Sequence, residues 1–360
     1  MTGGAGPRVD SFGRQRRVQM KPEVKAIHRA IGILGERLGF EATYEASGSV
    51  LALDLPDAYR PRADVLWSQP ISAAMQAALD GVLHLDRPIS NLPVAGFEVE
   101  GSGPSTKTMT SDVVNLVAIG TRLSFLVVSE AGEKNIYRRA VRVLRTMRRS
   151  FGDLGVVPLE AGWLDKTIEL QLDPSPSQIH PMPARKPLGG ESSGWTAAVR
   201  ALLRRVGERA GFTVVEPHIP PVLEATFERQ RELKSSEKWS DYFTASQIDM
   251  AWLLPMPRGL TELMFAIDQN DRSLDQYGLL YREAYDRVPV VGFEFESNPG
   301  KHAAGGLANL SAYTLMGVTV VGSERHRRTM EGALTRYRPT LGLRNVQVRM
   351  AEDFIARLGE

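Results

Sequence analysis

Two short stretches of this sequence each carry a pair of glutamates separated by one residue, at the end of an apolar run. The first reads PVAGFEVE and contains Glu98 and Glu100, and the second reads PVVGFEFE and contains Glu294 and Glu296. Residues two apart in a β-strand point to the same face, so each pair presents two carboxylates side by side. Neighbouring carboxylates repel each other and resist desolvation, a penalty that a bound divalent cation removes. The spacing therefore indicates a metal site built from carboxylate oxygens.

A further acid precedes each glutamate pair. Asp64 lies in the segment ADVLW (63–67) and Asp249 in IDMAW (248–252), two short apolar runs that we expect to form neighbouring strands. Each aspartate would supply a third ligand. A solvent-facing strand can also carry glutamates without any function, and that interpretation holds for one isolated copy. The recurrence of the whole acidic set, between loops that differ in length, favours the metal site.

The acids belong to a longer internal repeat. Residues 35–40 read GERLGF and residues 207–212 read GERAGF, and each ends a stretch with the apolar spacing of an amphipathic helix. Later, residues 115–130 parallel residues 309–324. The pattern predicts two α/β units, each running helix, strand, strand with one acid, strand with two acids, helix, strand, helix.

The domain boundaries follow from this repeat and from local composition. We place a basic, flexible N-terminal tail at 1–21, a first domain at 22–164, a linker rich in proline and glycine at 165–194, and a second domain at 195–360. An insertion at about 224–241 is expected to form a solvated helix or helical hairpin.

Composition excludes several classes of protein. The 360 residues include no cysteine, which rules out a disulfide scaffold, a thiolate-ligated zinc site and a cysteine nucleophile. The net charge of +2 conceals a strongly basic tail that lacks the apolar core of a secretory signal. The longest apolar run, at about 111–128, is interrupted by polar and charged residues, so no membrane span is expected. We therefore expect a cytoplasmic protein.

The order of these motifs resembles the PD-(D/E)xK nuclease superfamily, also called restriction-endonuclease-like. The resemblance rests on the helix ending in GERLGF, on DVLW, on GFEVE, and on YRPTLG (337–342) before a short strand. It implies two tandem domains of this type, each a central mixed sheet flanked by helices, with one or two Mg²⁺ (or Mn²⁺) ions at the strand ends. It also implies Asp64 and Glu98 as metal ligands in the first copy, and Asp249 and Glu294 in the second.

The sequence departs from that superfamily at one catalytic position. Glu100 and Glu296 stand where lysine is usual, although some restriction enzymes that resemble the superfamily use glutamate there. Lys107 and Lys301 follow a few residues later and are candidates for orienting a water or a phosphate, but they are equally consistent with solvated loop lysines. The candidate catalytic residues are Asp64, Glu98, Glu100, Lys107, Asp249, Glu294, Glu296 and Lys301.

Arginines recur after the glutamates in both copies. They are Arg138, Arg142, Arg145 and Arg149 at helical spacing in the first, and Arg325, Arg327 and Arg328 in the second. Such rows are often simply solvated, but a row on a docked helix can follow a phosphate backbone. Beside a nuclease-like site they predict DNA as the partner.

The resemblance implies a metal-dependent DNA endonuclease of a restriction or anti-phage-defence type, in which the two domains act as an intrachain pseudo-dimer. The absent lysine favours an alternative: a catalytically degenerate nuclease fold that serves as a DNA-binding or assembly subunit. RNA or a small nucleotide as substrate, protein partners in a defence system and a homo-oligomer remain open. The six histidines lack paired metal spacing, and the sequence contains neither a Walker motif nor a nucleophile elbow.

Overall fold

The structure is a computed structural model. It describes residues 21–47, 61–83, 89–101, 105–129, 133–151, 155–179, 194–217, 248–270, 285–298, 303–341, 343 and 345–358. Residues 1–20 of the basic tail, the insertion at 224–241 and Lys301 lie outside this set.

Each half of the chain alternates helices and strands in the same order. The elements of the first half are α1 (Pro22–Arg37), β1 (Glu41–Ser47), β2 (Arg62–Pro70), α2 (Ala73–Val82), β3 (Asn91–Glu100), α3 (Thr106–Ile119), β4 (Leu123–Val128), α4 (Glu133–Phe151), β5 (Val156–Glu160) and α5 (Trp163–Thr167). Those of the second half are α6 (Gly194–Ala210), β6 (Thr213–Val215), β7 (Met250–Pro255), α9 (Arg258–Asn270), β8 (Arg287–Glu296), α12 (Ala303–Tyr313), β9 (Met316–Val321), α13 (Glu324–Leu341), β10 (Val346–Met350) and α14 (Ala351–Leu358).

The strands form two five-stranded mixed sheets with the same topology. The orders are β1-β2-β3-β4-β5 and β6-β7-β8-β9-β10. In both sheets the first three strands are antiparallel and the last three are parallel. A register shift after Trp67, between β2 and β3, recurs after Trp252, between β7 and β8. The predicted α/β class, with two mixed sheets flanked by helices, is therefore confirmed.

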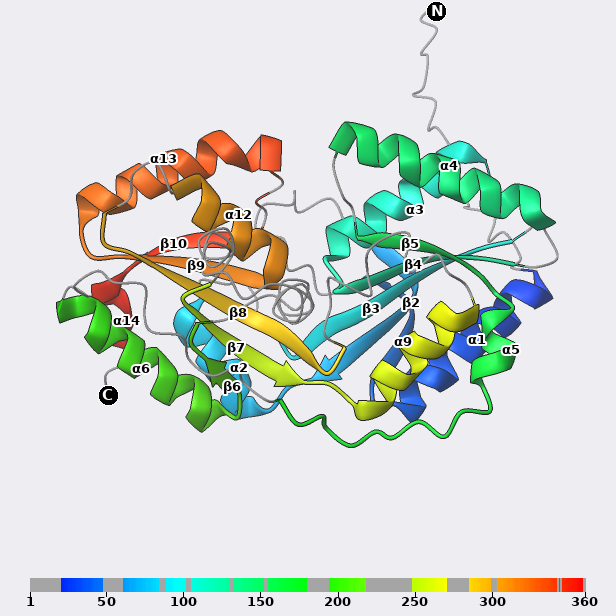
Figure 1. Ribbon diagram of the computed structural model, residues 1–360, viewed down its shortest axis with the longest axis horizontal. Coiled ribbons are helices and arrows are strands. Elements are labelled where there is room, and N and C mark those ends of the chain that lie inside the picture. Colours follow the sequence, from blue (N-terminus) through cyan, green and yellow to red (C-terminus); the bar gives the residue numbers. More distant parts are fainter. Residues whose placement is uncertain are drawn as a thin grey trace, which may run out of the picture.

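Helices cover both faces of each sheet. Figure 1 shows α3 and α4 above the first sheet and α12 and α13 above the second, with α1 and α5 below the first and α6 and α14 below the second. The sequence fits these positions because the strands that lie between two helical layers are apolar on both faces. All six residues of β4 and all six of β9 are buried.

Two helices that the repeat did not predict connect the halves. α2, between β2 and β3, packs on α6 and α14 of the second half, and α9, between β7 and β8, packs on α5 of the first half. Gly81 of α2 lies against Leu358 of α14, and Met75 lies near Gly211. The largest apolar core is therefore continuous across both halves, with Leu79 of α2 and Phe354 of α14 both fully buried in it.

Part of the predicted linker forms backbone hydrogen bonds with the residues at the start of α9. The Ser177 N–H donates to the Met256 carbonyl over 2.8 Å, and the Arg258 N–H donates to the Ser175 carbonyl over 2.9 Å. Gly259 approaches so closely that a side chain there would collide with Leu172 and the Asp173 backbone. Residues 172–177 therefore fix the start of α9 against the first half.

Candidate active site

The acidic strands are joined by the same hydrogen bond in both halves. Oδ2 of Asp64 accepts from the Val99 N–H over 2.8 Å, and Oδ2 of Asp249 accepts from the Phe295 N–H over 2.9 Å. In each case the aspartate lies beside the strand that carries the two glutamates. The repeated pattern of acids in the sequence thus corresponds to a repeated local structure.

Glu98 and Glu100 lie near the end of β3, which is paired on both sides. β3 lies between β2 and β4, and Glu98 and Glu100 are opposite Leu126 and Val128 of β4. Only 7% of Glu98 and 8% of Glu100 is exposed. A buried carboxylate is unfavourable unless a proton, a cation or several hydrogen bonds compensate for its lost hydration.

The alternate residues of β3 explain why the glutamates hold this position. Phe97 belongs to an aromatic cluster with Phe40, Trp67 and Phe125, in which its ring centroid lies 4.7 Å from that of Trp67 and 5.1 Å from that of Phe125. The strand alternation places the neighbouring glutamates on the opposite face, toward α3. Trp67 and Trp252, at matching positions of the two halves, are both fully buried.

A fourth acid, which the sequence pattern did not reveal, completes this cluster. Asp112 of α3 forms a side-chain hydrogen bond with Glu100, and its charge also acts on Glu98. It follows Met109 by three residues and precedes Leu116 by four, both of which are fully buried. This spacing places Asp112 near the helix face that packs on the sheet, and a polar residue on an apolar face was the signal that could have identified it.

Of four neighbouring acids in the first half, Asp64, Glu98, Glu100 and Asp112, the last three have a raised pKa in the absence of a cation. Burial raises the pKa of Glu98 to about 10, and the charges of Asp64 and Asp112 and a hydrogen bond with Asp64 add to the rise. Burial also raises the pKa of Glu100 to about 9, with the hydrogen bond and charge of Asp112 as further causes. The pKa of Asp112 is raised too, chiefly by burial. We call these four residues the first acidic cluster.

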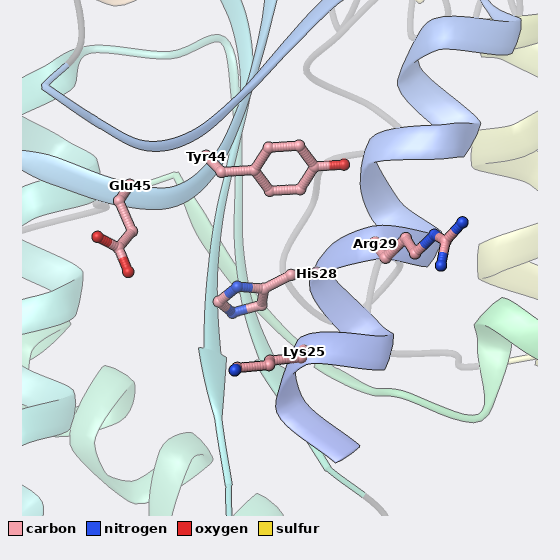
Figure 2. Close-up of a pocket in the computed structure, with 5 residues that line it drawn as sticks. All are labelled: Lys25, His28, Arg29, Tyr44 and Glu45. Atoms are coloured by element: carbon pink, nitrogen blue, oxygen red, sulfur yellow. The ribbon is translucent and has the colours of Figure 1, made fainter. Parts of the chain in front are cut away.

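His28 of α1 was also missed, and it faces this cluster. It is only 5% exposed, and its Nε2 lies 3.4 Å from Oδ2 of Asp64 without a hydrogen-bond partner. His28 also lines a pocket of about 590 Å³ together with Lys25, Arg29 and Tyr44. In Figure 2 the imidazole points away from α1 toward the strands, beside the Lys25 ammonium. His28 therefore forms part of the pocket wall while its Nε2 is buried.

The second half contains an arginine beside its aspartate. Nη2 of Arg200, from α6, lies 3.2 Å from Oδ2 of Asp249, and Nη1 donates to Oε1 of Glu216 over 2.7 Å. The guanidinium carbon lies 4.4 Å from the centre of the Phe295 ring. The pKa of Glu294 is raised, chiefly by burial and by the charges of Asp249 and Glu296, while Arg200 opposes the rise.

The structure brings some of the predicted site residues together and leaves others apart. Asp64, Glu98 and Glu100 come together, as do Asp249, Glu294 and Glu296. Lys107 is exposed in the first turn of α3. Lys301 lies outside the described residues.

The two predicted arginine rows also differ. Arg138, Arg142, Arg145 and Arg149 are exposed along α4, whose opposite face is buried. On α13, Arg327 pairs with Glu324 over 2.8 Å and with Glu331 over 3.2 Å, and Arg328 pairs with Glu324 over 3.2 Å. The neighbouring Arg325 is exposed. The α13 row is therefore partly neutralised by its own helix.

The first acidic cluster fits a hard divalent cation in its chemistry. Among the described residues, no three His, Asp or Glu side chains already stand in the arrangement of a metal site. The cluster nevertheless gathers the carboxylate oxygens that Mg²⁺ and Mn²⁺ take. Oε1 of Glu100 is buried and has no hydrogen-bond partner. Cation binding would thus require the carboxyl groups to lose protons and turn inward.

Comparisons with known protein families, with curated proteins and with solved structures find no significant match for this chain. The superfamily resemblance therefore stays a prediction. In the part of the chain that the structure describes, no helix is long and apolar enough to cross a membrane.

Proposed function

We propose that this protein is a metal-dependent phosphodiesterase that cuts DNA, with its catalytic centre at the first acidic cluster. The observation that carries the proposal is the burial of Glu98 and Glu100 beside Asp64 and Asp112. Four converging acids destabilise a folded protein, because each loses hydration and repels the others. A functional site is where such a cost is expected.

The first acidic cluster would hold the cation, Mg²⁺ or Mn²⁺, between Asp64, Glu98 and Glu100, with Asp112 fixing Glu100 through their hydrogen bond. When bound, the cation activates a water and neutralises charge on the scissile phosphate. The hydrogen bond from the Val99 N–H orients Asp64 toward the glutamate strand. The protein's own contribution is therefore the end of a central strand, which presents oxygen ligands at fixed spacing.

His28 and the pocket beside it supply the remaining chemistry. His28 lines the pocket while its buried Nε2 faces Asp64, so the imidazole can accept or donate a proton beside that aspartate. The exposed Lys25 ammonium on the same helix is placed to attract a phosphate oxygen. His28 and Lys25 would thus supply the functions of a catalytic lysine. Lys107 is exposed, and a glutamate stands at the position where lysine is usual.

The exposed arginines of α4 support DNA as the substrate. Arg138, Arg142 and Arg145 succeed one another at helical spacing, and these three also line a shallow pocket with Tyr137. Guanidinium groups in a row neutralise successive phosphates and release counterions. Duplex DNA presents such a series of phosphates, whereas a mononucleotide does not.

A second candidate function follows from the position of Lys107. Because this lysine is exposed and the position usual for lysine holds Glu100, the fold is also compatible with a DNA-binding subunit that does not cleave. The two candidates differ in what the acids do. In a binding subunit, neutralising Glu98 would leave DNA affinity and biological activity unchanged.

Cleavage of supercoiled plasmid in Mg²⁺ or Mn²⁺ tests the proposal. The natural protein should convert the plasmid to nicked or linear DNA, and Glu98→Gln should abolish this while keeping the folded circular dichroism spectrum. Glu160→Gln is the matched control, because Glu160 is an exposed glutamate at the end of β5 in the same sheet. Cleavage by the Glu98→Gln protein at the natural rate would refute the assignment of the site.

A further inference from the structure

The two acidic sites of this chain are not equivalent. The alignment that pairs Gly35 with Gly207, each packed on a tryptophan, places Arg200 opposite His28. Both side chains contact the aspartate of their own half, over 3.2 Å from Arg200 and 3.4 Å from His28. A titratable group in one copy is thus replaced by a permanent cation in the other.

In the second half, a glycine stands at the position of the fourth acid. The alignment that pairs Leu116 with Leu310 places Gly306 opposite Asp112. A Cβ atom at Gly306 would lie 3.4 Å from Oε1 of Glu296, so this position faces the second glutamate as Asp112 faces Glu100. At these two positions the second half therefore has one carboxylate fewer and one positive charge more.

Arg200 is held in place by neighbours that differ between the copies. Glu216 accepts hydrogen bonds from both Arg200 and Arg204, and the Phe295 ring lies under the guanidinium. In the first half, the same alignment puts Gly32 at the position of Arg204, and the Tyr44 side chain fills the space over that glycine. Several contacting residues thus differ together between the two halves. Those of the second half hold Arg200 beside Asp249.

We infer that the protein binds its divalent cation in the first half only, and that in the second half the guanidinium of Arg200 takes the place of the cation. This inference rests on the proposed metal-dependent function. A guanidinium cannot lose its charge near neutral pH, so it repels a divalent cation while it neutralises Asp249 and its neighbours. In the first half, Nε2 of His28 and Oε1 of Glu100 are buried and have no hydrogen-bond partner.

One consequence concerns the reaction. A chain with one cation-binding half has one catalytic centre, so each encounter with duplex DNA breaks one strand. Plasmid should accumulate as the nicked form before linear product appears, and the second half would serve to position the first.

Calorimetric titration with Mn²⁺ alone tests the inference without relying on activity. Glu98→Gln should abolish Mn²⁺ binding, whereas Glu294→Gln should leave its affinity and stoichiometry unchanged. His28→Arg, which gives the first half the arginine of the second, should lower Mn²⁺ affinity at least tenfold. Thermal unfolding followed by circular dichroism establishes that each variant is folded.

The reciprocal variant carries both exchanges, Arg200→His and Gly306→Asp, and should gain Mn²⁺ binding that Glu294→Gln then removes. Loss of Mn²⁺ binding in the single Glu294→Gln protein would overturn the inference while leaving the metal-dependent function standing. Absence of Mn²⁺ binding in the natural protein would instead overturn the proposed function, and the inference with it.

Discussion

Nη2 of Arg200 lies 3.2 Å from Oδ2 of Asp249. The corresponding contact in the first half is made by Nε2 of His28, 3.4 Å from Oδ2 of Asp64. The two copies of the internal repeat thus place the same acid beside two different basic side chains. Both halves keep the backbone hydrogen bond that orients the aspartate, while the basic side chain beside it differs.

The raised pKa of Glu98 makes the stability of the cation-free protein depend on pH. The folded state keeps a proton up to about pH 10, whereas the unfolded chain loses it near the ordinary value of 4.5. This stabilisation is therefore complete below the unfolded pKa and declines as pH rises between the two values, by about 1.4 kcal/mol per pH unit for one fully linked group. Urea unfolding in EDTA from pH 5.5 to 8.5 measures the slope.

Glu98→Gln should reduce that slope and raise the free energy of unfolding at pH 8.5, because the amide remains neutral at every pH. Glu160→Gln, on the exposed end of β5, should leave the slope unchanged. A natural protein whose stability in EDTA does not fall across this range would contradict the protonated state of the cluster.

Asp112→Asn tests the fourth acid. The substitution removes a charge that acts on both Glu98 and Glu100, and it changes the hydrogen bond to Glu100. We expect Mn²⁺ affinity to fall by roughly 10–100-fold, as is typical when a group that orients a ligand is replaced. Asp80→Asn, on the exposed face of α2, is the control. Equal Mn²⁺ affinities in the two variants would show that Asp112 has no part in the site.

The sequence predicted the parts of this site that lie in short repeated motifs. Glu98 and Glu100 are recognisable because strand alternation fixes their common face, and the second copy repeats the pattern. Asp112 and His28 were missed because each lies alone on an otherwise apolar helix face, where a single polar residue is ordinarily a satisfied core group. Only the packing of α1 and α3 on the sheet brings them to the acids.

The sequence could not predict that α2 packs on the second half and α9 on the first, and the reason here is different. A short apolar helix has the same pattern whichever sheet it covers, so its sequence does not specify the half on which it packs. The predicted order of elements within each half also passed directly from the strand with one acid to the strand with two. The omitted helices are α2 (Ala73–Val82, ten residues) and α9 (Arg258–Asn270, 13 residues).

The exposed arginines of α4 should contribute to DNA affinity more than those of α13. Replacing Arg138, Arg142 and Arg145 by glutamine should reduce the dependence of log K on log salt by about 0.9 for each phosphate that the protein no longer neutralises. Replacing Arg325, Arg327 and Arg328 should change it less, because Glu324 and Glu331 already pair with two of them. Fluorescence anisotropy over a salt series compares the triple variants, and a larger decrease in the α13 variant would reverse the assignment.

Because α2 and α9 each pack on the other half, the two halves should unfold together. Leu79 of α2 is fully buried in a core that also contains Val199 of α6 and Phe354 of α14. Leu79→Ala should lower the free energy of unfolding by about 2–5 kcal/mol, the usual cost of a buried leucine. Because α2 belongs to the first half and packs on the second, the whole transition should shift as one. Urea unfolding monitored by tryptophan fluorescence and circular dichroism should give coincident curves, whereas a second half that melts separately would contradict the continuous core.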